Sequence, residues 1–280
     1  MSEKFCITVL VENSVHRRGL KAEHGLSFLI ESGGRRVLFD TGQTELVLEN
    51  AGTLGCSLED LDAIVLSHGH DDHTGGLAAV RHRSPNTRVF LHPAAMQPKF
   101  SGSTPGVARY IGMPEASRQA VAGIGKNLVV TQTHQEVIQG VFVTGEIPRR
   151  TDFEDVGGRF FLDEQCQQPD PLMDDQALYF PTAEGVVVVL GCAHAGVVNT
   201  LLHIEQLVEG APLRAVLGGM HLLNASPERL ADTVEALRRW NVPLLAPAHC
   251  TGLVALARLW ESFPGRCAAA DVGSRFVFER

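Results

Sequence analysis

The sequence predicts an α/β fold that carries its chemistry at the ends of strands. Short runs rich in Val, Ile, Leu and Phe, separated by turn residues, dominate the first third of the chain. From residue 186 onwards strands alternate with helical patterns, as in a parallel sheet covered by helices. In both parts histidines follow directly after apolar strands. With 280 residues the chain is long enough for one large core or two modest ones.

The first half is expected to form a series of short strands, with Gly33-Gly34 as a hairpin turn. These strands are Phe5–Glu12, Leu26–Glu31, Arg36–Asp40, Ala63–Ser67, Arg88–His92, Leu128–Thr131 and Val141–Thr144. Two segments, 93–127 and 145–175, are rich in Pro, Gly and polar residues. We expect them to be loop or lid insertions in a single domain that spans residues 1–280.

The second half is predicted to alternate between strand and helix. The strands are Val186–Leu190, Arg214–Leu217 and Val242–Ala246, and the helices run from Val197 to about Glu209 and from Pro227 to Trp240. Ser226 is a typical N-cap, and Pro227 is typical of the first helical turn. This rhythm places the carboxyl ends of several strands at one edge of a sheet.

Composition excludes several classes of function. The formal charge of −8 argues against a protein that neutralises nucleic-acid phosphates. No apolar run reaches the roughly 20 residues that span a bilayer, and the N-terminus reads as a strand rather than a secretion signal. The six cysteines are scattered and form no Cys-Xaa-Xaa-Cys pair. We therefore expect a cytoplasmic protein without nucleic-acid or membrane partners; the sequence does not fix an oligomeric state.

The densest chemical signal is the segment from Ser67 to Gly76, which follows the apolar strand Ala63–Leu66. It contains His68, His70 and His73 together with the carboxylates of Asp71 and Asp72. Neutral imidazole and carboxylate are the ligands that Zn²⁺, Fe²⁺ and Mn²⁺ take, and a tight turn at a strand end can bring them to one point. The segment therefore predicts a metal site.

Three further histidines follow apolar strands in the second half of the chain: His194, His221 and His249. Each is expected to emerge at the same edge of a sheet as the others. Core packing alone does not explain this repeated placement. We therefore expect these histidines to meet the ligand turn at residues 68–73.

The pattern His-Xaa-His-Xaa-Asp-His after a strand, with Leu38-Phe39-Asp40-Thr41-Gly42 upstream, resembles the signature of the metallo-β-lactamase superfamily. The resemblance implies a four-layer αββα sandwich with two metal ions at one edge. It assigns His68 and His70 to the first ion and Asp72, His73 and His249 to the second. Asp40 would support the site from outside the ligand set.

The sequence departs from the superfamily pattern where a Gly-Asp pair usually supplies a bridging carboxylate. Gly191-Cys192 stands in that context, and no Asp is present. Either His194 completes the first ion or bridges the pair, or Cys192 contributes a thiolate, or water alone bridges the ions. Cys192 as a small buried hydrophobic residue is the favoured interpretation. His221 is either a further ligand or a general acid.

A narrower resemblance rests on four segments: Glu23-His24-Gly25-Leu26-Ser27, Leu38 to Gln43, Gly145-Glu146-Ile147-Pro148-Arg149 and the Gly-Cys-Xaa-His-Xaa-Gly motif. They are similar to the subgroup named for 7,8-dihydropterin-6-methyl-4-(β-D-ribofuranosyl)aminobenzene 5′-phosphate synthase. Around these motifs, Asn13, His24 and Arg149 are candidate substrate-binding residues, with Lys99 and Arg109 as further cations for a phosphate or carboxylate. Capping or surface roles are the alternative for all of them.

These features predict a binuclear metal-dependent hydrolase with two divalent ions, zinc first and iron or manganese as alternatives. A water between two such ions loses a proton near neutral pH, and the resulting metal-bound hydroxide is a nucleophile. Asp72 would bind metal and orient this nucleophile, and His221 would protonate the leaving group. The expected substrate is a small phosphoester or anionic ester. The alternatives are transfer of a pterin-methyl group, and a non-catalytic protein that uses the metals to hold a ligand.

Overall fold

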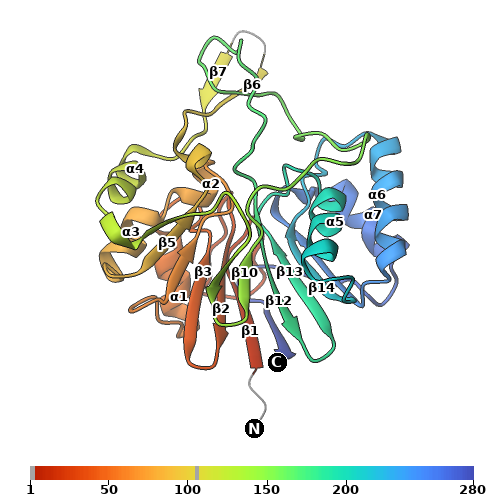
Figure 1. Cartoon of the computed structure of the whole chain (residues 1–280), viewed down its shortest axis with the longest axis horizontal. Helices are drawn as coiled ribbons and strands as arrows, with labels where there is room; N and C mark the ends of the chain where they lie inside the picture. The colour runs from red at the N-terminus through yellow and green to blue at the C-terminus, as the bar shows by residue number, and fades with distance from the viewer. Residues whose placement is uncertain (1–3, 105–106) are drawn as a thin grey trace.

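The computed structural model describes residues 4–104 and 107–280 and has four layers. Two β-sheets face each other in the middle, and helices cover the outer face of each (Figure 1). This arrangement confirms the predicted α/β sandwich. Residues 1–3 lie outside the described residues. They belong to the N-terminal segment for which the sequence predicts a strand and no secretion signal. Within the described ranges, none of the helices combines the length and apolar character that crossing a membrane requires.

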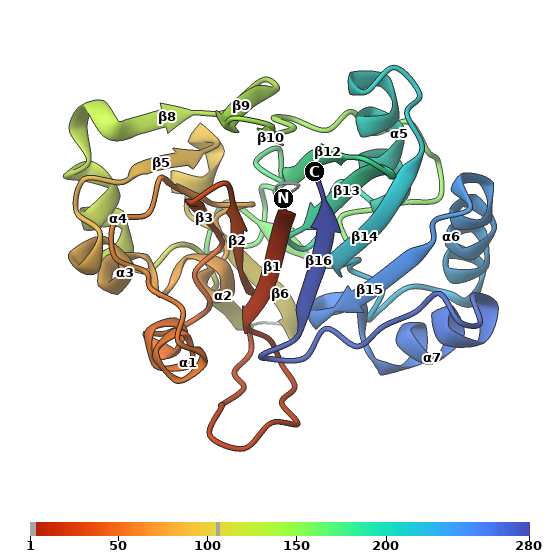
Figure 2. The ribbon, with the colours of Figure 1, turned by 90° about the horizontal axis from the view of Figure 1, so that it is seen from below.

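The first sheet comes from the first half of the chain, closed by the C-terminal strand. Its strands are β1 (Lys4–Val11), β2 (Ser27–Ser32), β3 (Arg35–Phe39), β4 (Ala63–Val65), β5 (Arg88–Leu91), β8 (Leu128–Val130) and β16 (Arg275–Glu279). Their order is β16-β1-β2-β3-β4-β5-β8. The run from β3 through β4 and β5 to β8 is parallel, so these strands end at one edge. Figure 2 shows β1 and β16 side by side, with Lys4 at the start of β1 paired to Glu279 at the end of β16.

The second sheet contains β9 (Gln135–Ile138), β10 (Val141–Val143), β12 (Ala177–Thr182), β13 (Gly185–Leu190), β14 (Leu213–Gly219) and β15 (Leu244–Ala248). Their order is β15-β14-β13-β12-β10-β9. β13, β14 and β15 are mutually parallel. Hydrophobic side chains of both sheets meet in the central core, where the rings of Phe5 and Phe180 stack with centroids 4.2 Å apart.

A further hydrophobic core lies between each of the two large sheets and its helices. The helices are α1 (Leu46–Leu54), α2 (Asp71–Thr74), α3 (Leu77–Arg83), α4 (Glu115–Ala122), α5 (Val197–Leu207), α6 (Pro227–Trp240) and α7 (Leu253–Ser262), with 3₁₀ turns η1 (Pro93–Met96), η2 (Gly125–Asn127) and η3 (His249–Thr251). α6 has the predicted bounds, and the Ser226 hydroxyl accepts the Arg229 N–H as the predicted N-cap.

The two predicted insertions are more ordered than their composition indicated. Segment 93–127 contains the hairpin β6 (Phe100–Thr104) and β7 (Val107–Tyr110) as well as α4, and segment 145–175 contains β11 (Phe160–Phe161). β11 pairs with β6 to form a third, small sheet that projects above the sandwich in Figure 1. The sequence did not indicate these strands, because the pairing joins residues about sixty positions apart and leaves no local periodic signal.

Candidate metal centre

The predicted site residues lie where strands end. Asp40 follows β3, His68 follows β4, His194 lies four residues beyond β13, and His221 and His249 follow β14 and β15. Because both sheets contribute parallel strands, these ends gather at the edge of the sandwich that carries α2 (Figure 1). The topology thus brings together residues that are up to 209 positions apart in the sequence.

Left-handed backbone conformations concentrate at these strand ends. The φ angles are 60° at Asp40, 55° at Ala193, 45° at His221 and 51° at His249. For a residue other than glycine this conformation costs about 1–2 kcal/mol. The surrounding fold compensates for this strain. The left-handed conformation turns the backbone sharply after each strand.

The first group of candidate ligands consists of His68, His70 and His194. His68 Nε2 lies 3.0 Å from His70 Nδ1, and the His194 ring centroid lies 4.8 Å from that of His68 and 4.9 Å from that of His70. Within the described residues, no group hydrogen-bonds to His70 Nε2 or His194 Nε2, although both atoms are buried. Buried polar atoms are rarely left without a partner. The lone pairs of these two nitrogens are therefore available to bind a cation.

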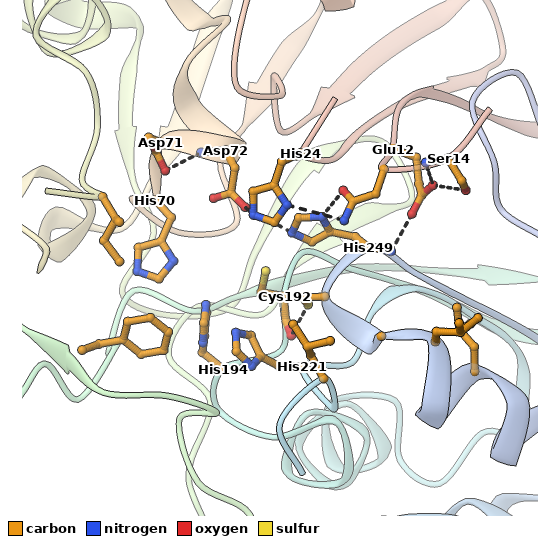
Figure 3. Close-up of a pocket in the computed structure, with 18 of the residues that line it drawn as sticks. Glu12, Ser14, His24, His70, Asp71, Asp72, Cys192, His194, His221 and His249 are labelled. Carbon is orange, nitrogen blue, oxygen red and sulfur yellow. Dashed lines mark hydrogen bonds and ion pairs between the residues drawn. The ribbon is translucent and has the colours of Figure 1, made fainter. Parts of the chain in front are cut away.

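The second group consists of Asp72, His73 and His249. The Nε2 atoms of His73 and His249 are 3.2 Å apart, and His249 Nε2 lies 3.3 Å from Asp72 Oδ2. The same carboxylate oxygen lies 3.2 Å from Nε2 of His24, which is the exposed member of the cluster. Figure 3 shows His24, Asp72 and His249 next to one another, with His194 and His221 below them.

The remaining ring nitrogen of four of these histidines is held by a protein oxygen. Nδ1 of His68 lies 2.9 Å from Ser67 Oγ, Nδ1 of His73 lies 2.7 Å from Asp40 Oδ2, Nδ1 of His194 lies 2.8 Å from the Val156 carbonyl, and Nδ1 of His249 lies 2.9 Å from Asn13 Oδ1. Such partners fix the tautomer that leaves Nε2 available as a lone-pair donor. The donor set therefore fits divalent metal ions.

Burial controls the protonation of the imidazoles. It lowers the pKa of His70 to about 3 and holds the pKa values of His68 and His194 well below the ordinary value. These rings are neutral near pH 7, which is the form that binds metal. His73 differs: burial alone would lower its pKa, but the carboxylates of Asp72 and Asp40 raise it to about 9.

A cavity of 460 Å³ opens over both groups. His70, Asp72, His194, His249 and Cys192 are among its lining residues. The third sheet and its flanks contribute Arg109, Ile111 and Phe160, and the opposite side contributes Leu223, Leu253 and Leu256. The cavity thus combines the polar ligand cluster and one arginine with apolar walls, and its size suits a small molecule.

His221 also lines the cavity and packs against a predicted ligand. Its ring centroid lies 4.2 Å from that of His194, and Figure 3 shows the two rings side by side. A Cβ atom at Gly157 would lie 2.0 Å from His221 Nδ1, so the backbone runs directly against the ring. Burial lowers the pKa of His221 to about 4. At neutral pH it is therefore a neutral imidazole with a single N–H.

The weaker predictions separate into two groups. Asn13 and His24 line the cavity, and Asn13 also holds His249. Arg149 instead donates to the carbonyls of His194 and Pro171 and is not among the cavity residues. Lys99 is fully buried, with Nζ 2.8 Å from Asp170 Oδ2 and 2.9 Å from Asp174 Oδ1. Its expected role as a substrate or surface cation is replaced by an internal ion pair.

Three acidic residues that position the site were missed by the sequence analysis. Glu12 Oε1 accepts the His249 N–H at 2.7 Å, Asp174 Oδ2 accepts the Gly69 N–H at 2.7 Å, and Asp175 Oδ2 accepts the Ala195 N–H at 2.8 Å. Each carboxylate therefore holds the backbone beside a candidate ligand. Glu12 ends a strand pattern and Asp174-Asp175 lie in a polar loop, so the sequence carried no signal for these contacts.

Comparisons with known proteins agree with this geometry. Residues 20–164 match the model of the metallo-β-lactamase superfamily. The 7,8-dihydropterin-6-methyl-4-(β-D-ribofuranosyl)-aminobenzene-5′-phosphate synthase of Methanocaldococcus jannaschii is 31% identical over 252 residues, which cover 86% of this chain and 85% of that protein. An uncharacterized protein of the same organism is 32% identical over 257 residues, covering 90% of this chain and 93% of that protein.

Among solved structures, a metal-dependent hydrolase of the β-lactamase superfamily superposes with a TM-score of 0.84 at 31% identity. The match covers 99% of this chain and 100% of that chain. The structural agreement therefore extends over both sheets and the segments between them.

Proposed function

The chain belongs to the metallo-β-lactamase superfamily, and we propose that it is a hydrolase that uses two divalent metal ions to cleave a small phosphoester or anionic ester. The observation that carries the proposal is the pair of adjacent candidate metal groups His68–Cys192–His194 and His73–Cys192–His249, in which every residue is buried. Zn²⁺ is the first choice for such a donor set, with Fe²⁺ or Mn²⁺ as alternatives.

The residues divide between binding and proton handling. His68, His70 and His194 would hold one ion, and Asp72, His73 and His249 the other. Two divalent ions supply an activated water and electrophilic stabilisation of the group under attack. Burial alone would raise the pKa of Asp72, but the imidazoles of His73, His24 and His249 hold it well below the ordinary range. Asp72 is therefore a carboxylate that can accept a hydrogen bond from the attacking water.

His221 is assigned to the leaving group. The sequence predicts a metal ligand or a general acid at this position, and burial lowers the pKa of His221 to about 4, so the ring carries no charge near neutral pH. A neutral imidazole can still donate its N–H to the oxygen on which negative charge develops, as neutral histidines do in other enzymes. In this role His221 stabilises the departing oxygen by a hydrogen bond.

Arg109 supports the choice of an anionic substrate. It is the arginine among the cavity residues, and a guanidinium binds phosphate or carboxylate through two parallel hydrogen bonds. We expect Arg109→Ala to raise KM for an anionic substrate more than it lowers kcat. Arg214→Ala is the matched control, because Arg214 pairs with Glu184 and is not among the cavity residues. Equal effects of both substitutions on KM would contradict this assignment.

A second candidate function comes from the relative that is named as a synthase of a dihydropterin-methyl aminobenzene ribofuranosyl phosphate. In that reaction class the site would join a pterin-methyl group to an aminobenzene ribofuranosyl phosphate with departure of diphosphate. Incubation with a dihydropterin diphosphate and the aminobenzene acceptor separates the two proposals. A coupled product identified by mass spectrometry would support transfer, and release of free hydroxymethyl pterin would support hydrolysis.

The primary test is metal analysis of protein purified without oxygen, together with a screen of phosphodiesters, phosphomonoesters, lactones and thioesters. We expect about two ions per chain and turnover of at least one class. Asp72→Ala is expected to lose an ion and turnover together. Asp71→Ala is the matched control, since Asp71 is the neighbouring carboxylate outside both ligand groups. Unchanged turnover in Asp72→Ala would refute the mechanism.

A further inference from the structure

The sulfur of Cys192 lies between the two groups of candidate ligands. Cys192 Sγ is 3.1 Å from His73 Nε2. Among the described residues, it forms one candidate metal group with His68 and His194, a second with His73 and His249, and a third with His221 and Cys250, with the ligand atoms of each group within 4.8 Å of one another. Figure 3 shows the Cys192 side chain between the His194–His221 pair and the Asp72–His249 side of the cavity.

This position is where the bridging carboxylate is missing. A pair of divalent ions brings a high positive charge into a buried site, whereas imidazoles bind metal in their neutral form and Asp72 is the single carboxylate among the predicted ligands. A second anion shared by both ions would balance this charge. Within the described residues, the thiol of Cys192 lies near histidines of both ligand groups. As a thiolate, it would supply this second anion.

We propose that Cys192 binds both metal ions as a bridging thiolate, in an extension of the proposed binuclear function. The S–H proton passes to bulk water as the ions bind, and the sulfur lone pairs form the two metal–sulfur bonds. No electron transfer is involved. The alternative interpretation is that Cys192 is only a small buried hydrophobic residue. It does not explain why Cys192 lines the cavity with its sulfur beside the imidazole of His73.

The position of Cys192 beside His73 is compatible with ligation of one ion by both residues. Zinc binds thiolate at about 2.3 Å and imidazole at about 2.0–2.1 Å, so two such ligands on one ion stand less than about 4.4 Å apart. The 3.1 Å separation between Cys192 Sγ and His73 Nε2 lies inside this limit. The neighbouring thiol of Cys250 is directed to the Cys192 carbonyl, with Sγ 3.5 Å from that oxygen. Cys250 lines the same cavity and forms a candidate metal group with Cys192 and His221, but it belongs to neither histidine pair, so Cys250→Ser is the control for Cys192.

A thiolate bridge has a consequence for metal selection. Soft sulfur ligands favour Zn²⁺ over the hard ion Mn²⁺, whereas a carboxylate bridge accepts both. The wild-type site should therefore prefer Zn²⁺ over Mn²⁺ by a larger factor than the site of a Cys192→Asp variant does.

The experiment is a Co²⁺ titration of the metal-free full chain without substrate, followed by near-ultraviolet absorption and metal counting. A thiolate bound to Co²⁺ gives an intense charge-transfer band, which imidazole and carboxylate do not. We expect this band in the wild type and in Cys250→Ser, and its loss in Cys192→Ser together with a drop in affinity for Co²⁺ of about 10²-fold or more. Cys192→Asp should bind about two ions without the band, since it restores an anionic bridge.

Three outcomes would overturn the inference. These are a wild type that binds two Co²⁺ ions without the band, a band that persists in Cys192→Ser, or a Cys192→Ser variant with unchanged affinity. Cys192→Asp keeps the test informative if the serine variant fails to fold. A wild type that takes up no Co²⁺ would refute both the bridge and the binuclear site. A wild type with the band but without turnover of any ester would contradict only the hydrolase proposal.

Discussion

The carboxylate of Asp40 accepts a hydrogen bond from the imidazole of His73 over 2.7 Å, and both side chains are completely buried. Asp40 also accepts the Ser67 N–H through Oδ1 and the Ser67 hydroxyl through Oδ2, each at 2.7 Å. One residue at the end of β3 thereby orients the turn that carries the candidate ligands. The support is electrostatic as well as steric, because the carboxylate makes the imidazole a stronger donor to a metal.

Replacement of Asp40 by Asn is expected to weaken metal binding by about 10–100-fold, the usual effect of removing such a supporting partner. Competition with a coloured chelator measures this change. Asp62→Asn is the control, because Asp62 accepts the Arg36 N–H away from the site. Equal metal affinity in Asp40→Asn and Asp62→Asn would show that the Asp40 contact is dispensable.

Removal of the metal ions should lower the thermal stability of the chain. The ligand groups bring several neutral imidazoles and one buried carboxylate together, and ions that bind only the folded state stabilise it by about 4 kcal/mol at a thousandfold excess over Kd. Thermal unfolding of chelated protein measures this contribution. Addition of Zn²⁺ should restore the melting temperature and the turnover together. A melting temperature that does not depend on metal would argue against a built site.

The substitution His221→Ala separates a proton-donor role from metal ligation. If the ring donates a hydrogen bond to the leaving oxygen, kcat should fall by about 10²-fold or more while metal content stays at the wild-type level. The loss should be smaller for esters with a good leaving group, such as a nitrophenolate, because such groups need less stabilisation. Loss of a metal ion in His221→Ala would instead assign this residue to the ligands.

Lys99 is expected to be one of the most sensitive positions for stability. Its ammonium neutralises two carboxylates in the interior, and Lys99→Met would leave Asp170 and Asp174 buried without a counter-charge, at a cost of about 3–5 kcal/mol. Lys21→Met is the matched control, since the Lys21–Glu49 ion pair is exposed and should contribute less than about 1 kcal/mol. Urea unfolding of both variants tests the contrast, and similar losses would refute it.

The carboxyl of Glu154 should make the stability of the fold depend on pH. Burial raises its pKa, against the opposing hydrogen bonds from the N–H groups of Val198 and Asn199. The folded protein therefore keeps a proton that the unfolded chain releases above about pH 4.3. The contribution of Glu154 to the free energy of unfolding consequently falls as the pH rises from that value to the raised pKa.

Glu154→Gln removes this titration. The free energy of unfolding of the variant, relative to that of the wild type, should therefore increase as the pH rises through the same window. The altered hydrogen bonds of the variant shift this difference by an amount that does not depend on pH. Urea unfolding of metal-free protein at several pH values measures the difference. A difference that is independent of pH would contradict the raised pKa.

Much of the site was predictable because its residues follow strands. An apolar run that is followed by His68, His194 or His249 predicts both a strand and the edge at which it stops. Parallel strands end at the same edge of a sheet, so these histidines are expected to lie close together. The same reasoning could not find Glu12 or Asp174. Their contacts with His249 and Gly69 join residues 237 and 105 positions apart, and such separations carry no periodic signal.

The sequence by itself determined the layered α/β fold and the kinds of ligand, because hydrophobic periodicity and side-chain chemistry are local properties. Only the tertiary structure decided which groups share a point in space. It placed Cys192 between the two histidine groups, directed Arg109 to the cavity, turned Arg149 to backbone carbonyls and enclosed Lys99 with two carboxylates. The physical reason is that these contacts depend on how two sheets and a small third sheet pack against one another, which no single stretch of sequence specifies.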